Sequence, residues 1–517
     1  MNKAYKNINF IDKQTIRNKK LFRKLIVNND KFLTISSIFK IFKELKIKLF
    51  NNVFDKYVNL IKDNKISEDV FLKILEQNKK LYKILSNNLS IKNAKAFDDQ
   101  MNNIFQKTMQ NKSGNVADYI PQLARVNPEK FAVSICSIDG QKFSYGDCND
   151  EFCVQSASKP IIYSMALEEH GLEKVHNHVG REPSGRGFNA FVLNYHGLPH
   201  NPMINSGAIM CSSLLNSKLN NADRFEYITN IWKSLSGNGK IGFNNTVYLS
   251  EKATADRNFA LGYFMNENKA FPKNTNLHEA LDLYFQMCSI TINANDFSNI
   301  AATFANGGIC PLTGYRIFTP ETTKNCLSLM YSCGMYDYSG EFAFRFGLPA
   351  KSGVSGVLIV VIPNVMGVCI WSPRLDRLGN SVRGIEFIKE LVEEFNFNII
   401  SQLIPGLSSN KINREDNDRN MRLNLMDLYY AVMENDLNHI KTIVAKGVNL
   451  SEGDYDGRTA LHLAASEGHI EIVKYLLEQN ASIIVKDRWN NTPLEDSIRH
   501  KNNEITVLLK KKLNKIL

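Results

Sequence analysis

The sequence predicts an α+β domain with a helical region before it and an all-α repeat region after it. Two strand pairs lie near residues 131–145 and 357–371, and helical segments fill the chain between them. Strands at both ends of a segment with helices between them are typical of α+β architectures. A run without glycine precedes this domain, and a repeat of 33 residues follows it. The predicted bounds are 1–30 for a basic, weakly ordered end, 31–110 for the helical region, 111–400 for the α+β domain, 401–422 for a linker and 423–515 for the repeats.

The helical prediction for residues 31–110 rests on the spacing of apolar residues. Phe39, Ile41, Phe42 and Leu45 recur at helical intervals, which favours a small helical bundle. The thirty residues before it hold eight Lys and Arg residues against two Asp. Solvated chain ends account for this excess of positive charge, so neither a nucleic acid nor a membrane is expected as a partner.

The composition is that of a globular chain in a reducing compartment. Hydrophobic residues make up 44% of the chain, which is enough to form a large core. The nine cysteines are an odd number and lack the paired CxxC spacing of a zinc site, so neither a disulfide framework nor a metal is expected. No apolar signal segment is visible, and the cytoplasm is the expected location. The basic, acid-poor start keeps a mitochondrial location as the alternative.

The two strand pairs are identified by their turns. Asp139-Gly140 separates two β-prone runs and supplies the positive φ of a tight hairpin. The apolar stretch Val354–Trp371 is nearly long enough to span a membrane, but Pro363-Asn364 interrupts its middle. Its β-branched residues therefore favour two buried strands joined by a turn. Between the pairs, a helix near residues 297–304 is predicted to end at Asn306-Gly307-Gly308.

The C-terminal region contains a sequence repeat. Thr459-Ala460-Leu461-His462 is followed 33 residues later by Thr492-Pro493-Leu494, and Asp454 and Asp487 stand at the same separation. This pattern resembles the ankyrin repeat, whose period and TPLH-type core it shares. A chance helical hairpin is the alternative. Ankyrin surfaces bind many ligands, so a protein partner is expected here, but its identity is left open.

Candidate chemistry begins with Ser156 and Lys159. A serine hydroxyl is a weak nucleophile unless a nearby base takes its proton, and a neutral lysine amine can be that base. Spacing of three places both side chains on one face of a helix, and burial at a helix N-terminus would lower the lysine pKa. The SxxK motif alone carries little weight, because Ser37–Lys40 and Ser408–Lys411 also match it. Pro160 disfavours the helical conformation at Lys159.

A second motif, Lys351-Ser352-Gly353, makes the first more specific. In the β-lactamase and penicillin-binding-protein fold, SxxK is followed much later by a K[ST]G triplet on an edge strand beside the nucleophile. Lys112-Ser113-Gly114 also matches the triplet, but it precedes SxxK, whereas Lys351 follows it and leads into a strand. The Val354 N–H could pair with that of Ser156 as an oxyanion hole, and Tyr336 between the motifs could shuttle a proton.

Longer stretches of the chain resemble the serine-dependent glutaminases, particularly the animal kidney and liver types with C-terminal ankyrin repeats. The resemblance covers residues 31–400 and, more loosely, the repeats. The matching stretches are Ala117–Ala124, Gln155-Ser156 with Lys159-Pro160, Glu182–Gly185, Pro199–Ile209, Asp256–Ala260 and Gly347–Val354. The fold that this implies has a β-lactamase-like catalytic domain, with an antiparallel sheet flanked by helices.

The resemblance also implies roles for individual residues in hydrolysis of glutamine to glutamate and ammonia. Ser156 would be the nucleophile, Lys159 its general base, and Tyr119 and Tyr336 neighbours that assist proton transfer. The residues implied to bind glutamine are Ser156, Asn205, Glu251, Asn258, Tyr284, Tyr336 and Val354. These types suit the substrate, because the α-ammonium group favours a carboxylate and the α-carboxylate favours neutral donors.

The resemblance implies no cofactor. It does imply activation by inorganic phosphate and assembly into a homotetramer. Both are tied in the relatives to the loop that here reads Gly185-Arg186-Gly187-Phe188-Asn189. An arginine is expected where Gly187 stands, so this departure leaves phosphate dependence and assembly open. Two alternatives remain: another β-lactamase-like serine–lysine amidohydrolase, and a catalytically idle scaffold that works through its repeats. The intact set Ser156, Lys159, Tyr119 and Tyr336 argues against the idle scaffold.

Overall fold

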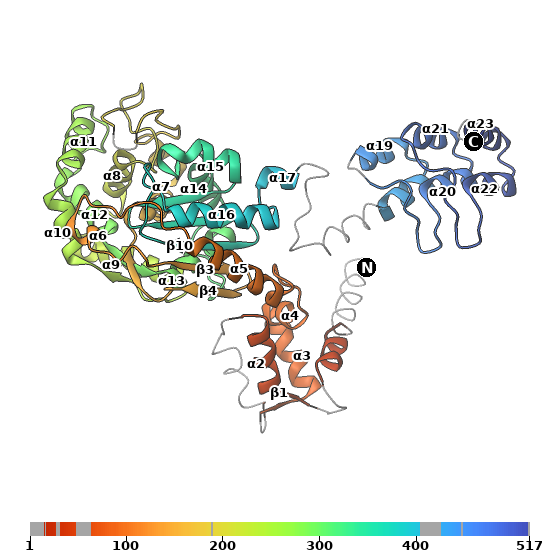
Figure 1. Ribbon diagram of the computed structural model, residues 1–517, viewed down its shortest axis with the longest axis horizontal. Coiled ribbons are helices and arrows are strands. Elements are labelled where there is room, and N and C mark those ends of the chain that lie inside the picture. The colour runs from red at the N-terminus through yellow and green to blue at the C-terminus, as the bar shows by residue number, and fades with distance from the viewer. Residues whose placement is uncertain are drawn as a thin grey trace, which may run out of the picture. The chain divides into compact units, whose positions relative to one another are not determined.

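The computed structural model divides the chain into two compact units, residues 1–399 and 400–517 (Figure 1). The described residues are 15, 17–26, 32–47, 61, 64–187, 190–403, 425–445 and 448–514. Most of the predicted linker, and residues Phe188 and Asn189 of the altered loop, therefore lie outside the described residues. Among the described residues, no helix combines the length and apolar character needed to cross a membrane.

The first unit is built on a five-stranded antiparallel sheet of order β4-β3-β10-β9-β8. The strands are β3 (Ala132–Ser137), β4 (Lys142–Gly146), β8 (Ala350–Gly353), β9 (Val357–Ile362) and β10 (Met366–Trp371). Both predicted hairpins are confirmed: Gly140 has φ 88° in the β3–β4 turn, and Asn364 has φ 61° in the β9–β10 turn. Strands β3, β9 and β10 are buried along their whole length, as expected for the centre of a covered sheet.

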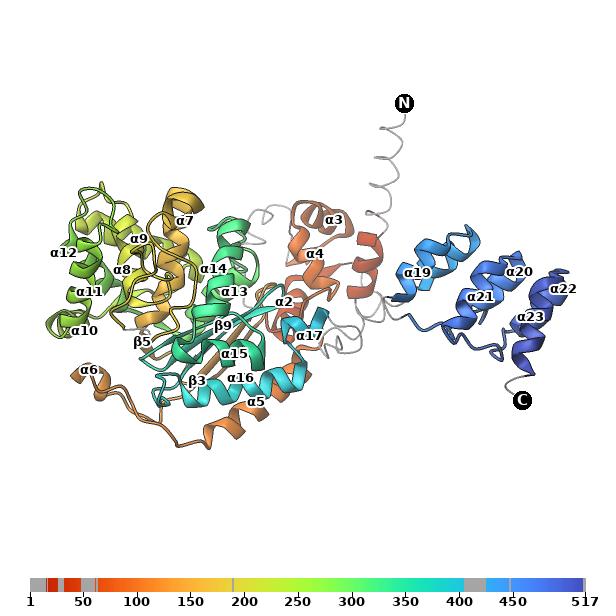
Figure 2. The same ribbon diagram turned by 90° about the horizontal axis from the view of Figure 1, so that it is seen from above.

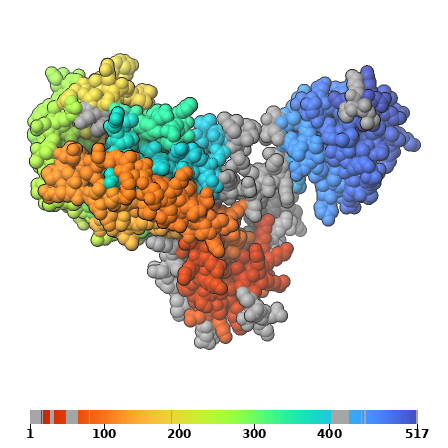
Figure 3. Space-filling view, in the orientation of Figure 1, coloured from red at the N-terminus to blue at the C-terminus, as the bar shows by residue number. Residues whose placement is uncertain are grey.

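Helices cover both faces of this sheet (Figure 2). Helix α13 (Ala294–Ala305) packs on β3, β9 and β10. The helix approaches β10 very closely at Gly367. If this glycine had a Cβ atom, that atom would lie 2.1 Å from the Ala302 backbone nitrogen. On the other face, α5 (Ala94–Met109) and α16 (Val382–Phe395) pack side by side and lie as neighbouring orange and cyan bands in Figure 3. The predicted helix end is confirmed, since α13 stops before Asn306.

A second, largely helical layer of the same unit carries a small sheet of order β5-β7-β6. Its strands are β5 (Glu151–Cys153), β6 (Gly242–Phe243) and β7 (Ile290–Asn293). The helices of this layer are α6 (Pro121–Ala124), α7 (Lys159–His176), α8 (Asn205–Leu214), α9 (Asn221–Ser236), α10 (Asn245–Ala253), α11 (Asp256–Glu267) and α12 (Leu277–Cys288). Helix α14 (Pro320–Cys333) packs on α7 and β8, and α15 (Ser339–Phe346) packs on α14 and α16. The sequence analysis did not predict this sheet, because strands of two to four residues show no clear periodicity.

The N-terminal helices dock on the tip of the β3–β4 hairpin. They are α2 (Ile35–Glu44), α3 (Glu68–Gln77) and α4 (Lys79–Leu85), with a two-residue strand pair, β1 (Leu33–Thr34) and β2 (Lys65–Ile66). At the hairpin, the Gln141 side chain donates to the Leu45 and Ile91 carbonyls. The Asp139 carboxylate accepts from the Ser90 N–H at 2.6 Å and from Lys83 at 2.5 Å.

Part of the basic end predicted to be weakly ordered is helical. Residues 17–25 form a helix whose Leu21 and Phe22 are buried against this bundle. The Phe22 ring lies 5.2 Å from the Phe71 ring. The prediction weighed the charge of this segment and overlooked its two adjacent large apolar residues, which a helix can bury together.

The second unit has the predicted repeats. Its helices include residues 425–433, α19 (Leu437–Ala445), α20 (Ala460–Glu467), α21 (Ile470–Glu478), α22 (Pro493–Arg499) and α23 (Asn503–Leu513); the short α17 (Ile399–Leu403) stands at the boundary between units. The same pair of hydrogen bonds recurs at the 33-residue spacing of the repeat. Asp454 accepts from the N–H groups two and four residues onward, and Asp487 does the same.

Candidate active site

The predicted nucleophile lies in a tight turn between the small sheet and a long helix. Ser156 belongs to the 3-10 turn η2 (Gln155–Ser158), and Lys159 is the first residue of α7. Pro160 is therefore the second residue of the helix, where its missing N–H breaks no helical hydrogen bond. Lys159 keeps helical angles, with φ −57° and ψ −42°, despite the proline that follows it. The predicted tension is thus accommodated without distortion at the start of the helix.

The Ser156 hydroxyl and the Lys159 amine are in direct contact. Lys159 Nζ lies 2.6 Å from Ser156 Oγ, and Lys159 is 1% exposed. Burial lowers the pKa of Lys159 to about 8, and the charge of nearby Glu251 only partly opposes that shift. Near neutral pH the amine is therefore neutral far more often than an ordinary lysine amine, and a neutral amine can accept a proton.

The predicted triplet Lys351-Ser352-Gly353 is confirmed to form the edge strand β8, and β8 lies beside η2. Gly353 permits this close approach, because a Cβ there would lie 2.8 Å from the Val154 carbonyl oxygen. The next residue, Val354, brings its backbone N–H near the Tyr336 hydroxyl, where it acts to lower the pKa of Tyr336. The edge strand therefore delivers a backbone donor to the neighbourhood of Ser156.

Tyr336 is held close to the nucleophile in a strained conformation. It begins the 3-10 turn η3 (Tyr336–Tyr338) with φ 54°, a left-handed value that is costly for an aromatic residue. Its hydroxyl lies near that of Ser156, which acts to lower the pKa of Tyr336. Burial raises the pKa of Tyr336, so the phenol is protonated and can donate. Gln155, directly before the nucleophile, is also left-handed, with φ 49°.

Tyr119 contacts a different group. Its hydroxyl donates to Glu251 Oε1 at 2.6 Å and to Gln155 Oε1 at 3.2 Å. The Tyr119 residue is 48% exposed, whereas its hydroxyl end reaches the buried Glu251. Burial raises the pKa of Glu251, and the Tyr119 hydrogen bond opposes that shift. Of the two predicted tyrosines, Tyr336 has the contact with Ser156, while Tyr119 holds Glu251.

The three remaining polar residues form a chain of hydrogen bonds. Tyr284 of α12 donates to Asn205 Oδ1 at 3.1 Å, and Asn205 Nδ2 donates to Asn258 Oδ1 at 3.1 Å. Asn205 is the first residue of α8, and Asn258 lies in the first turn of α11. The Tyr284 ring lies 5.6 Å from Lys159 Nζ, which links this chain to the nucleophile. The uncharged donors and the helix N-termini together favour an anionic group.

The predicted residues thus come together from distant parts of the chain. Gln155 is the contact residue that the sequence analysis did not assign a role, although it adjoins Ser156 in the matching stretch. Its left-handed backbone and its hydrogen bond from Tyr119 are visible only in three dimensions. The sole sequence signal was its position directly before the SxxK serine.

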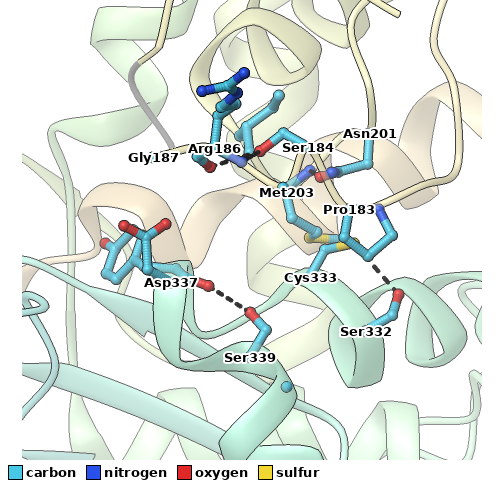
Figure 4. Close-up of a pocket in the computed structure, with 14 residues that line it drawn as sticks. Pro183, Ser184, Arg186, Gly187, Asn201, Met203, Ser332, Cys333, Asp337 and Ser339 are labelled. Carbon is cyan, nitrogen blue, oxygen red and sulfur yellow. Dashed lines mark hydrogen bonds between the residues drawn. The ribbon is translucent and has the colours of Figure 1, made fainter.

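A cavity of about 460 Å³ adjoins this cluster and shares Tyr336 with it (Figure 4). The loop residues Pro183–Gly187 form one wall, and Cys333, Asp337 and Ser339 lie on the opposite side. The altered loop of the sequence analysis therefore lies next to the cluster. Ser156 itself does not line this cavity.

These contacts define a class of protein. A helix that starts at an SxxK lysine, an edge strand with KSG and an antiparallel sheet covered by helices form the β-lactamase-like architecture of serine–lysine hydrolases. Comparison with known proteins gives a narrower assignment. The glutaminase family model matches residues 114–400, which is more than half of the chain, and a model of three ankyrin repeats matches residues 428–516.

Individual relatives agree with this match. The chain is 46% identical to putative glutaminase 2 of Caenorhabditis elegans over 433 residues, covering 83% of this chain and 71% of the relative. It is 45% identical to the mitochondrial glutaminase liver isoform of Mus musculus over 415 residues, which covers 80% of this chain and 69% of the relative. A solved structure described as the probable glutaminase ybaS has 34% identity and a TM-score of 0.56, and the match covers 58% of this chain and 97% of that one. The chain therefore belongs to the glutaminase family.

Proposed function

We propose that this chain hydrolyses L-glutamine to L-glutamate and ammonia through a glutamyl-serine acyl-enzyme. The observation that carries the mechanism is the 2.6 Å contact between Ser156 Oγ and a buried Lys159 whose pKa is lowered to about 8. A solved structure described as Mglu in its glutamate form supports the choice of product. It has 31% identity and a TM-score of 0.55, and the match covers 59% of this chain and 69% of that one.

In the first half-reaction, neutral Lys159 removes the Ser156 proton as Oγ attacks the side-chain amide carbon. The C–O bond forms, and the carbonyl electrons move to oxygen, where the backbone N–H groups of Ser156 and Val354 stabilise the negative charge. The oxyanion then collapses and the C–N bond breaks. The departing nitrogen takes a proton from the Tyr336 hydroxyl, which is replenished from the Lys159 ammonium. Ammonia and the acyl-serine are the products.

In the second half-reaction, water takes the place of ammonia. Lys159 is neutral again and accepts a proton from the water through Tyr336 as the water oxygen attacks the ester carbon. Collapse of the second tetrahedral species breaks the bond to Ser156 Oγ, which regains its proton from Lys159. Glutamate leaves and the starting protonation state is restored, so the cycle needs no further reactant.

The α-amino and α-carboxylate groups of glutamine fit two parts of the cluster. Glu251 is a buried carboxyl group held by Tyr119, and the substrate ammonium group supplies the cation that would stabilise its charged form. The chain of Asn205, Asn258 and Tyr284 supplies neutral donors for the carboxylate.

Glu251→Gln is expected to raise KM for glutamine about 10- to 100-fold, because a charged hydrogen bond contributes about 1.5–3 kcal/mol. Steady-state kinetics with wild-type protein alongside give the comparison. Glu279→Gln, an exposed position near the start of α12, is the matched control and is expected to leave KM unchanged. An unchanged KM in Glu251→Gln would remove Glu251 from substrate binding.

We infer that the loop beside the cavity still responds to phosphate. Among the described residues that line the cavity, Arg186 is the one cation, and Asp337 lies across from it. The test of the proposed function is release of ammonia and glutamate from glutamine by the full-length protein, with phosphate titrated from zero and the molecular mass measured at each concentration. We expect equimolar products, a higher rate with phosphate and a shift toward the tetramer. A flat phosphate curve would show that the Gly187 departure has removed activation. No release from folded protein at any phosphate concentration would exclude glutaminase activity.

The mitochondrion is the location we infer. The mouse and rat relatives are both named as mitochondrial, which favours the alternative that the basic start suggested over the cytoplasm. Fractionation of cells that produce the full-length chain tests this inference.

A further inference from the structure

A second buried lysine, which the mechanism above does not use, lies behind the tyrosine beside the nucleophile. Lys351 is 0% exposed on β8. Its Nζ donates to the Gly334 carbonyl at 3.0 Å and to the Ser352 carbonyl at 2.8 Å. It also lies 4.5 Å from the centroid of the Tyr336 ring. No carboxylate among the described residues lies within ion-pair distance of it.

These contacts match the directions in which a lysine head group can donate. An ammonium group has three N–H donors, and here two face carbonyl oxygens and the ring face takes the third direction. Burial lowers the pKa of Lys351, with the charge of Lys159 as a further cause. The three contacts suit the ammonium form of Lys351, whereas burial favours the neutral amine. A neutral amine keeps two N–H groups. In either state, the two carbonyl contacts can form.

The carbonyl that Lys351 holds belongs to the segment that sets the Tyr336 conformation. Gly334 ends α14, and two residues later Tyr336 takes its left-handed φ of 54°. The Gly334 oxygen also accepts from the Ser352 N–H at 3.2 Å. The segment is pressed onto β8, because a Cβ at Gly334 would lie 1.8 Å from the Ala350 oxygen.

We propose that Lys351 is a positioning residue: it clamps the Gly334 carbonyl and the Tyr336 ring, and so keeps the Tyr336 hydroxyl beside Ser156. A left-handed aromatic residue persists only where surrounding contacts hold it. Lys351 supplies such contacts to the main chain and to the ring from a single side chain. The inference rests on the proposed function, in which Tyr336 delivers a proton to the departing ammonia.

The test compares two substrates that differ in their need for that proton. Ammonia leaves glutamine only after protonation, whereas the thiolate of L-glutamate γ-methyl thioester leaves with much less assistance. Lys351→Met removes the donors and retains the length of the side chain. We expect its kcat for glutamine to fall about 30-fold or more, its KM to stay within about threefold, and its kcat for the thioester to fall less than about fivefold.

Two further variants make the result specific. Lys142→Met is the matched control, because Lys142 is also a buried lysine that donates to several oxygens, among them Asn299 Oδ1 at 2.6 Å, but it lies on β4 away from Ser156. For Lys142→Met, the ratio of kcat for glutamine to kcat for the thioester is expected to equal the wild-type ratio. In the Tyr336→Phe background, Lys351→Met is expected to add less than a twofold loss of glutamine kcat.

Equal losses on both substrates, or a full additional loss in the Tyr336→Phe background, would overturn the positioning role. If Lys351→Met fails to fold, Lys351→Gln is measured instead, since it can still donate to one carbonyl; failure of both to fold would assign Lys351 a purely structural role and also overturn the proposal. Wild-type protein inactive on both substrates would contradict the proposed function instead, so the two failures are distinguishable.

Discussion

Ser156→Ala is expected to lower kcat for glutamine by roughly 10⁴-fold or more, because no other group can form the acyl-enzyme. The variant should fold as wild type does, since solvent or substrate can replace the hydrogen bond between the hydroxyl and Lys159. Residual binding is expected to persist, so that glutamate still protects the variant against thermal unfolding. The measurement is ammonia release together with a melting curve, with and without glutamate.

The control for this variant lies on the helix that follows the nucleophile. Ser164 is fully buried, and its hydroxyl donates to the Pro160 carbonyl. Ser164→Ala therefore removes a buried serine hydroxyl without touching the nucleophile, and its activity is expected to stay within a few-fold of wild type. Hydroxylamine added to wild-type protein should yield glutamyl hydroxamate by intercepting the acyl-serine. Activity in Ser156→Ala near the wild-type level would exclude the serine mechanism.

The second large effect concerns Lys159 and pH. The mechanism requires the neutral amine, and the pKa of Lys159 is lowered to about 8. Below that pH the amine is protonated in most molecules, so kcat/KM should fall about tenfold per pH unit on the acid side and level off above about 8. An ordinary lysine pKa of 10.5 would move this rise more than two pH units upward.

Lys159→Met should lower kcat by about 10²- to 10⁴-fold and abolish the rise of activity between pH 6 and 8. The measurement is a pH–rate profile of both proteins on glutamine, corrected for the stability of each at every pH. A profile for Lys159→Met that retains a midpoint near 8 would assign the ionisation to another group. The acid limb in wild type together with its loss in the variant would identify Lys159 as the base.

The serine–lysine pair, the KSG strand and the hairpins have local signals in the sequence, whereas the roles of Tyr119 and of the residues expected to bind glutamine came only from the family resemblance. The serine and lysine are three residues apart, the KSG triplet leads into an apolar strand, and Asp139-Gly140 and Pro363-Asn364 mark the hairpin turns. Such local signals depend on turn chemistry and side-chain spacing, which a sequence displays directly.

The remaining features depend on contacts between distant segments. Neither Gln155 nor Tyr336 is a residue type that favours positive φ, so nothing in the sequence marked their left-handed backbone. The pairing of Tyr119 with Glu251 joins residues 132 positions apart. The position of Lys351 behind the Tyr336 ring depends on how the end of α14 meets β8, and no periodicity encodes that contact.

The tip of the β3–β4 hairpin has a consequence for how this part of the chain can vary. Hairpin turns usually accept insertions and substitutions because they face solvent. Here Asp139 is 4% exposed and Gln141 is fully buried, and both hold the backbone of the segment between α4 and α5. This turn is therefore constrained as strictly as a core position. A shorter relative without such helices is free to change it, whereas this chain can alter the turn only together with the helices that cover it.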